Sequence, residues 1–233
     1  MKKVGFLIFV AALVVGFIAA NASSIGRLSD RPFNMTFNFG GVKGSGNSVS
    51  ENRDLDGFRG VDVSSSFEVV ITAQKDFSVT VEADDNILPL IETEVRRGVL
   101  NIECSRRVSP KTPMRILISA PDIDDVETSG AANVTLNSIK NSKLKIDSSG
   151  ASRVFVTGET SKLLIELSGA TKVDAEALLA ETANIETSGA SQASVNVLNS
   201  LRTDASGASK ITYSGNPRDL NTKKSGAASV SPQ

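Results

Sequence analysis

Residues 165–173 read Ile-Glu-Leu-Ser-Gly-Ala-Thr-Lys-Val, and the tripeptide Ser-Gly-Ala at their centre decides the fold. This tripeptide occurs six times, and successive glycines lie 20, 19, 20, 18 and 19 residues apart. Such a period marks a repeat architecture, in which each unit buries its apolar face only by stacking on its neighbours. We expect the six tripeptides to form the corners of that stack: Ser129, Gly130, Ala131, Ser149, Gly150, Ala151, Ser168, Gly169, Ala170, Ser188, Gly189, Ala190, Ser206, Gly207, Ala208, Ser225, Gly226 and Ala227.

Apolar residues flank each glycine at every second position. Around Gly169, Leu163 and Ile165 precede the corner, and Val173 and Ala175 follow it. This period of two is typical of strands, whereas a helix would repeat about every 3.6 residues. Each unit therefore predicts a strand, a tight corner at Ser-Gly-Ala, a second strand and a looser return.

A unit of about 19 residues with short strands fits one coil of a β-helix. The Leu-x-x-Leu-x-Leu-x-x-Asn pattern of leucine-rich repeats is absent, and a propeller blade needs roughly 40 residues. Coils that run in one direction pair in parallel, and parallel crossovers are right-handed by default. The sequence thus predicts an all-β fold, a right-handed single-stranded parallel β-helix (solenoid) with about 19 residues per coil in its C-terminal half.

Each residue of the corner has an expected role. The glycine supplies a backbone dihedral that a Cβ would forbid. The alanine is expected to point a small side chain inward, and the serine hydroxyl to bond a backbone group or to stack in a ladder of hydroxyls. Six equivalent serines without a neighbouring base argue against a catalytic serine. The run Ser64-Ser65-Ser66 is expected to be a degenerate form of the same corner.

Composition excludes several classes of function. The 233 residues include no histidine and no tryptophan, and Lys plus Arg (25) nearly balance Asp plus Glu (26). Catalytic triads and metal sites built on histidine are therefore excluded. The chain also lacks the excess of positive charge that is typical of proteins that bind nucleic acid. Cys104 is the only cysteine, so no intramolecular disulfide can form. We expect it to be a small buried hydrophobe, with a reactive thiol or an intermolecular disulfide as the alternatives.

The N-terminal residues have the features of an export signal. Lys2 and Lys3 precede an apolar run from Val4 to Ala20, and Ala20-Asn21-Ala22 offers a small-residue cleavage site. The run of 17 residues is at the lower limit for spanning a bilayer, so an uncleaved membrane anchor is the alternative. We expect an exported protein, either free or anchored by residues 4–20.

The character of the sequence changes along the chain. Alternating phenylalanines predict a single strand near residues 33–39, and a short helical or irregular crossing is expected at 87–91. We expect the irregular coils before the repeats to continue the β-helix and cap its first rung, with a separate β-domain as the alternative. The expected parts are a signal peptide or N-terminal membrane anchor (1–22), a linker with that strand (23–52), irregular N-terminal β-coils (53–125) and regular Ser-Gly-Ala repeats (126–231).

The last repeat differs from the others in its charge. Its acidic position is occupied by Lys223, Lys224 follows, and Pro232 stands near the end of the repeat. Charge and proline are typical of strands that must not pair edge to edge. We expect these residues to blunt an exposed sheet edge, with a basic docking patch as the alternative.

Charged residues recur three positions before and three positions after the glycines. With coils roughly 4.8 Å apart, they would form an acidic and a basic column. We expect a solvated polar stripe partly neutralised by the basic column, with calcium binding or catalysis by paired carboxylates as the alternatives. Equivalent acids show no pair in contrasting environments, as acid and base roles require. The acidic residues are Glu127, Asp147, Glu166, Glu186 and Asp204, and the residues after the glycines are Asn133, Arg153, Lys172, Gln192 and Lys210.

Several segments carry a resemblance to a known family. These segments are Gly44–Gly46, Phe58–Val63, Val81–Ile91, Glu94–Val95, Gly98–Ile102 and the Ser-Gly-Ala series. With them the chain resembles the putative auto-transporter adhesin, head GIN domain family, over roughly Arg53 to Ser231. The resemblance implies a bacterial exported or envelope protein with a right-handed parallel β-helix, and it transfers no catalytic residues.

These features predict an exported, non-enzymatic β-helix of the bacterial cell envelope, in the periplasm, on the outer surface or secreted. It would bind or adhere through a repetitive polar face. Expected contact residues are the acidic column and the corner residues Ser152, Thr171, Ser191 and Ser209. A polysaccharide-active enzyme of the pectin-lyase type and a purely structural envelope spacer are the alternative functions.

The expected partner is a cell-surface protein or glycan, and not nucleic acid. Contact with a membrane would be made only by the N-terminal segment, if it is not cleaved. No cofactor is expected, and calcium on the acidic column is the alternative. The sequence leaves the oligomeric state open.

Overall fold

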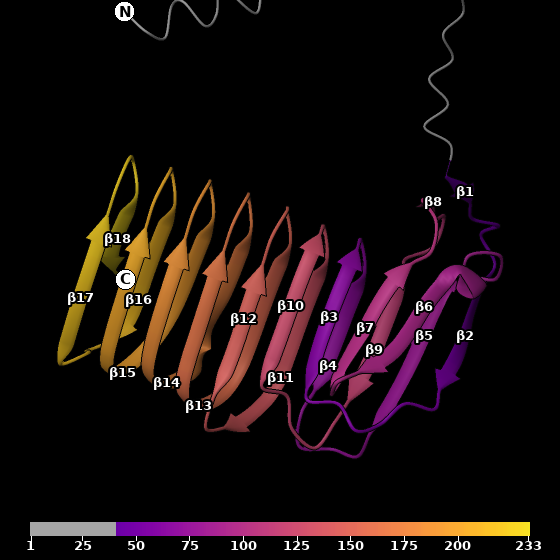
Figure 1. The fold of residues 1–233 in the computed structure, drawn as a ribbon, viewed down its shortest axis with the longest axis horizontal. Helices are drawn as coiled ribbons and strands as arrows, with labels where there is room; N and C mark the ends of the chain where they lie inside the picture. Colours follow the sequence, from indigo (N-terminus) through magenta and orange to yellow (C-terminus); the bar gives the residue numbers. More distant parts are fainter. Residues whose placement is uncertain (1–40) are drawn as a thin grey trace, which may run out of the picture. The chain divides into compact units, whose positions relative to one another are not determined.

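A computed structural model describes residues 41–233, whose strands stack as successive β-coils (Figure 1). The predicted all-β, parallel β-helix is confirmed, since the strands of successive repeats pair in parallel. The predicted export signal, its cleavage site and the strand near residues 33–39 lie outside the described residues. Within residues 41–233, no helix has the length and apolar character needed to cross a membrane.

Nearly all of the regular structure is strand. The single helical element is η1, one short 3-10 turn among the described residues. The elements are β1 (Val42–Lys43), β2 (Ser48–Arg53), β3 (Gly60–Ser65), β4 (Glu68–Thr72), β5 (Ser78–Asp84), η1 (Leu88–Leu90), β6 (Ile91–Arg96), β7 (Val99–Cys104), β8 (Val108–Ser109), β9 (Arg115–Ser119), β10 (Asp125–Gly130), β11 (Asn133–Asn141), β12 (Leu144–Ser148), β13 (Arg153–Leu167), β14 (Lys172–Thr187), β15 (Gln192–Ala205), β16 (Lys210–Gly215), β17 (Asp219–Lys224) and β18 (Ser229–Pro232).

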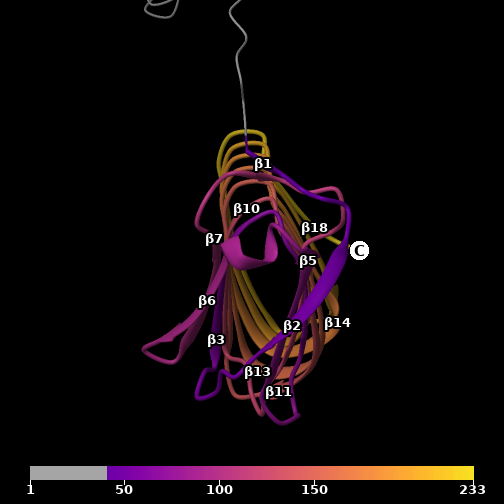
Figure 2. The same cartoon turned by 90° about the vertical axis from the view of Figure 1, so that its right-hand side faces the viewer.

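The coils are flattened, so that their strands form two sheets, one on each side of the core (Figure 2). We call the sheet with order β6-β7-β3-β10-β12-β13-β14-β15-β17 the first sheet. The second sheet has the order β2-β5-β9-β4-β11-β13-β14-β15-β16-β18. The long strands β13, β14 and β15 run through both, because each begins in the second sheet and bends into the first.

The core lies between the two sheets and follows the period of two. Counted from Gly169, the side chains at even offsets are buried up to six residues on either side, for example Ile165 and Val173, both 0% exposed. Each inward side chain stacks on its equivalents in the rungs above and below, as Ile165 does between Ile146 and Ile185. Burying one such side chain stabilises the fold by about 1.5–3 kcal/mol, and the repeat multiplies this gain along the stack.

The chain does not build its rungs in sequence order at the N-terminal end. The rung of β3 and β4 lies between the rung of β7 and β9 and the rung of β10 and β11. Beyond β7 and β9, the strands β2, β5 and β6 pair antiparallel. The end of the core is covered by η1, as predicted for residues 87–91, with Ile87 and Leu88 buried (Figure 2). Residues 48–52, which the sequence placed in the linker, belong to the edge strand β2.

The segment before β2 is fastened by a buried carboxylate. Asp84 is 0% exposed and accepts backbone N–H bonds from Gly46 (2.6 Å), Lys111 (2.8 Å) and Thr112 (3.2 Å). Burial by itself would raise the pKa of Asp84, but the N–H groups of Lys111, Thr112 and Gly46 together lower it. A Cβ on Gly44 would collide with this carboxylate, so the glycine is needed for the close approach.

Candidate binding surface

The six Ser-Gly-Ala tripeptides lie at the narrow edge of the coil that joins the first sheet to the second. Each glycine has a positive φ, for example +83° at Gly169, which glycine adopts without strain. The glycines also stack closely, because a Cβ on Gly169 would lie 2.5 Å from the carbonyl oxygen of Gly150. The N–H of Ala170 donates to this carbonyl at 2.8 Å, so the parallel ladder continues around the corner.

The degenerate corner predicted at Ser64–Ser66 is confirmed. Ser65 pairs with Gly130 in the parallel register and has the same kind of conformation, with φ +96°. Its carbonyl accepts the N–H of Ala131 at 3.1 Å, as the glycine carbonyls do in later rungs. A non-glycine residue with this φ is strained, so the first corner is held by its neighbours.

The inward direction expected for the corner alanines is wrong. Each alanine directly follows the glycine, at an odd offset, and residues at odd offsets point to solvent. Together with the serines and glycines they form a smooth outer ridge. The exposed alanines are Ala131, Ala151, Ala170, Ala190, Ala208 and Ala227.

The corner residues expected to contact a partner are buried, so that prediction is also wrong. Ser152, Thr171, Ser191 and Ser209 are at most 1% exposed. They stand two residues after the glycine, and this even offset points them into the core. There the hydroxyls form an incomplete ladder, in which Thr187 Oγ1 donates to Ser209 Oγ at 3.0 Å but Thr171 Oγ1 has no partner among the described residues. This polar strip inside the corner was missed, although the parity of the repeat could have revealed it.

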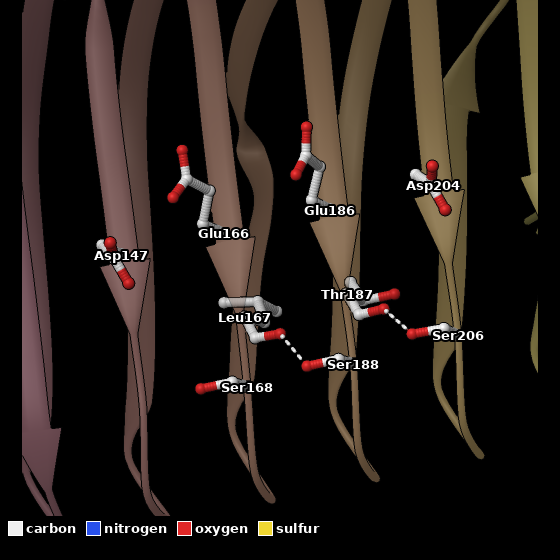
Figure 3. A pocket seen from close by; sticks show the side chains of 9 residues that line it. All are labelled: Asp147, Glu166, Leu167, Ser168, Glu186, Thr187, Ser188, Asp204 and Ser206. Carbon is white, nitrogen blue, oxygen red and sulfur yellow. Dashed lines mark hydrogen bonds between the residues drawn. The ribbon is translucent and has the colours of Figure 1, made fainter.

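The strand register aligns the acidic residues in one column on the outer face of the first sheet, as the repeat spacing predicts (Figure 3). The column begins one rung earlier than expected, because Asp62 of β3 pairs with Glu127. After Asp204 it ends at Lys223. We call the following residues the acidic column: Asp62, Glu127, Asp147, Glu166, Glu186 and Asp204.

Four members of the acidic column line a depression beside the corner serines (Figure 3). Two of the serines at its rim are held by the preceding rung, since Ser188 Oγ donates to the Leu167 carbonyl at 3.4 Å and Ser206 Oγ to the Thr187 carbonyl at 3.2 Å. Their hydroxyls are therefore engaged within the fold. The residues of the column in the depression are Asp147, Glu166, Glu186 and Asp204.

Little positive charge offsets the column. Among residues 41–233, one ion pair involves it, between Lys145 Nζ and Asp147 Oδ2 at 3.3 Å. At the other end of the column, partial burial and the neighbouring carboxylates of Asp62 and Asp147 raise the pKa of Glu127. The column is thus a row of like charges whose repulsion a cationic partner would relieve.

The basic column lies on the outer face of the second sheet. Asn133, Arg153, Lys172, Gln192 and Lys210 follow one another in register. In the described part of the chain, no ion pair joins this column to the acidic one. The two columns therefore lie on different outer faces, and the neutralisation expected across the corner is not made by direct contacts.

No described residues form a group of three or more His, Cys, Asp or Glu side chains arranged to hold a metal ion. Calcium on the acidic column therefore stays a prediction. Cys104 is half-buried at the margin of the core, and burial raises the pKa of its thiol. A raised pKa lowers the thiolate fraction, which favours the expected packing role over a reactive thiol.

The family model described as "Putative auto-transporter adhesin, head GIN domain" matches residues 57–217. The chain belongs to this family. The matched range contains the whole acidic column of this head GIN domain and ends before β17 and β18. No curated protein sequence matches the chain.

Solved structures share the fold of this head GIN domain. A putative adhesin from Bacteroides fragilis is 18% identical, with a TM-score of 0.68 over 83% of this chain and 100% of that one. A putative adhesin from Parabacteroides distasonis is 17% identical, with a TM-score of 0.53 over 82% of this chain and 99% of that one. At these identities the likeness establishes the β-solenoid alone.

Proposed function

We propose that this head GIN domain is a non-enzymatic binding module of the cell envelope that adheres through its acidic column. One observation carries the proposal: six carboxylates stand in register on one outer face, and within residues 41–233 only Asp147 is ion-paired. The description of the family as an adhesin supports a role in binding. The partner would be a cell-surface protein or glycan that carries repeated positive groups.

The physical basis is multivalency on a rigid ladder. Strands in a sheet lie about 4.8 Å apart, so the carboxylates present an evenly spaced row. Each exposed charge pair contributes little by itself, about 0–1 kcal/mol. A partner that engages several carboxylates at once gains from their combined effect, because later contacts form at high effective concentration. Such binding should weaken as salt screens the charges.

We also propose that the protein is exported, through the signal formed by Lys2, Lys3 and the apolar run to Ala20. An adhesive face is useful only where it meets its partner, which supports a location in the periplasm, on the outer surface or outside the cell. N-terminal sequencing of protein from the producing bacterium would distinguish cleavage after Ala22 from a retained anchor. An intracellular, unprocessed protein would contradict export.

The acidic column can be tested by removing charge without changing shape. The variant Glu166→Gln/Glu186→Gln/Asp204→Asn neutralises three neighbouring rungs. Its control, Asp54→Asn/Asp56→Asn/Glu181→Gln, removes the same charge from exposed positions outside the column. On arrays of cell-surface glycans and proteins, the column variant should bind at least 10-fold more weakly than the control. Equal binding by the two variants would contradict the proposal.

Two further arms of this experiment address calcium and catalysis. Binding measured with and without calcium shows whether a cation bridges the column to an acidic partner, since such binding would disappear on chelation. Incubation with uronate polymers tests the pectin-lyase alternative. If the wild type releases unsaturated or reducing ends and the column variant does not, the acidic column is catalytic and the adhesion proposal is contradicted.

A further inference from the structure

The first corner of the stack, Ser64–Ser66, has no other corner stacked against it on the side of β7 and β9. In every Ser-Gly-Ala corner above it, the alanine N–H donates to the residue at the apex of the preceding corner, as Ala151 does to Gly130 at 2.7 Å. Ser66 occupies this position in the first corner, and its N–H has no acceptor among the described residues. The reason is that the preceding rung, β7 and β9, is joined by a loop in place of a corner.

This loop contributes two arginines beside the open corner. Ser65, Ser66, Cys104, Arg106 and Arg107 line one depression, and none of its lining residues is acidic. Both arginines are exposed, and within residues 41–233 neither is ion-paired. Two arginines and Ser66, whose backbone N–H is unpaired, therefore line one depression.

The loop is held in place from the opposite side. The N–H of Val42 donates to the Arg107 carbonyl at 2.9 Å, and the N–H of Gly44 donates to the Ser109 carbonyl at 2.9 Å. Further along, the N–H of Lys111 bonds the buried carboxylate of Asp84 at 2.8 Å. A loop fixed in this way loses little conformational freedom when a ligand binds, which favours recognition.

The two carboxylates that take part in this hydrogen-bond network, Asp84 and Asp85, are already engaged. Asp84 accepts three backbone N–H groups and is buried, and Asp85 accepts the hydroxyl of Ser45 and the amide of Asn47. Neither of them forms an ion pair with Arg106 or Arg107. The depression consequently keeps its positive character, in contrast to the acidic column on the first sheet.

We propose that this depression binds a phosphate group, carried either by a soluble phosphate ester or by an anionic lipid headgroup. A guanidinium presents a planar fork of N–H donors that matches two phosphate oxygens, and Ser66 adds a backbone N–H and a hydroxyl. Backbone N–H groups at such corners are common anion ligands. The site is separate from the acidic column and does not depend on the adhesion proposal.

Titration with glycerol 3-phosphate, followed by amide NMR, tests the site directly. The Ser66 amide resonance should shift and saturate, while that of Ala151, which is bonded to Gly130, should stay in place. In Arg106→Gln/Arg107→Gln the affinity should fall at least 10-fold. The control Arg202→Gln/Arg218→Gln, which removes the same charge from exposed arginines elsewhere, should keep it. Far-UV circular dichroism checks that both variants fold.

Sedimentation with vesicles of phosphatidylcholine, with or without phosphatidylglycerol, identifies the source of the phosphate. Binding to the anionic vesicles that the Arg106→Gln/Arg107→Gln variant loses assigns the site to a lipid headgroup. Loss of glycerol phosphate binding without any vesicle binding assigns it to a soluble ester. The proposal is overturned if neither probe binds, or if the control variant loses binding to the same extent.

Discussion

Replacing Gly169 by alanine tests whether the close stacking of corner glycines holds the coils together. The new Cβ would lie 2.5 Å from the Gly150 carbonyl oxygen and 3.2 Å from its nitrogen, at a φ of +83°. Backbone atoms at such distances cannot move aside as a flexible side chain could. The variant therefore combines a strained conformation with a collision between two rungs.

The expected loss of stability can be estimated from these two contributions. A left-handed conformation costs a non-glycine residue about 1–2 kcal/mol, and overpacking against fixed neighbours costs about 1–3 kcal/mol. Gly57 provides the control, because it has a φ of +71° but no heavy atom within 4 Å of its ideal Cβ. We expect Gly169→Ala to lower the free energy of unfolding by about 2–5 kcal/mol and Gly57→Ala by about 1–2 kcal/mol.

Urea denaturation followed by far-UV circular dichroism measures both values, since the chain has no tryptophan to report by fluorescence. Alanine restricts the unfolded chain equally in the two variants, so this effect cancels in the comparison. Faster hydrogen exchange at Ala170 and Ala190 would locate the damage at the corner. If both variants lose the same stability, close stacking contributes nothing and the reasoning is refuted.

Three further predictions concern the first corner, the buried carboxylate and the internal hydroxyls. Ser65→Gly should raise the free energy of unfolding by about 0.5–1 kcal/mol. Glycine relieves the strain at φ +96°, and its greater flexibility in the unfolded chain offsets part of that gain. A lower urea midpoint would contradict this prediction. The pKa of Asp84 is lowered in the folded state, so its stabilising effect is present above the unfolded pKa of about 3.9 and disappears as the pH falls through the folded value. The thermal midpoint of Asp84→Asn should thus depend less on pH below about 4 than that of the wild type, and parallel curves would count against the assignment. Thr171→Val should leave the free energy of unfolding unchanged or raise it, because Thr171 Oγ1 has no partner among the described residues. Thr187→Val should lower it by about 1 kcal/mol, because the hydrogen bond to Ser209 is lost. Equal effects of the two substitutions in thermal melts would contradict the proposed role of the hydroxyl ladder.

The repeat contained enough information to predict the coils and the position of the acidic column. A period of two and a recurring glycine determine which residues face the core, and alignment on the glycines determines which residues become neighbours. The predictions for the corner residues were wrong because they followed the type of residue and not its even or odd distance from the glycine. Ser152 and Thr171 are polar, yet their even offset from glycine places them inside, where the Ser152 hydroxyl accepts the backbone N–H of Ala132.

The N-terminal half could be predicted only in part. Its strands were visible as alternating apolar residues, and Ser64–Ser66 indicated a corner. Local patterns do not specify pairing order, however, so the insertion of β3 between β7 and β10 could not be read from them. The depression at Arg106 and Arg107 was missed for the same reason, because it exists only where this order brings a loop against an unmatched corner.

The order of the rungs also bears on how the chain is made. When β3 and β4 leave the ribosome, neither neighbour in the finished stack has been synthesised, since β7, β9, β10 and β11 all come later. Translation at about 5–20 residues per second leaves these two strands with bare edges for several seconds. When the chain is produced without residues 1–22, so that it folds where it is made, slowing translation after residue 72 should therefore increase aggregation more than slowing it after residue 141.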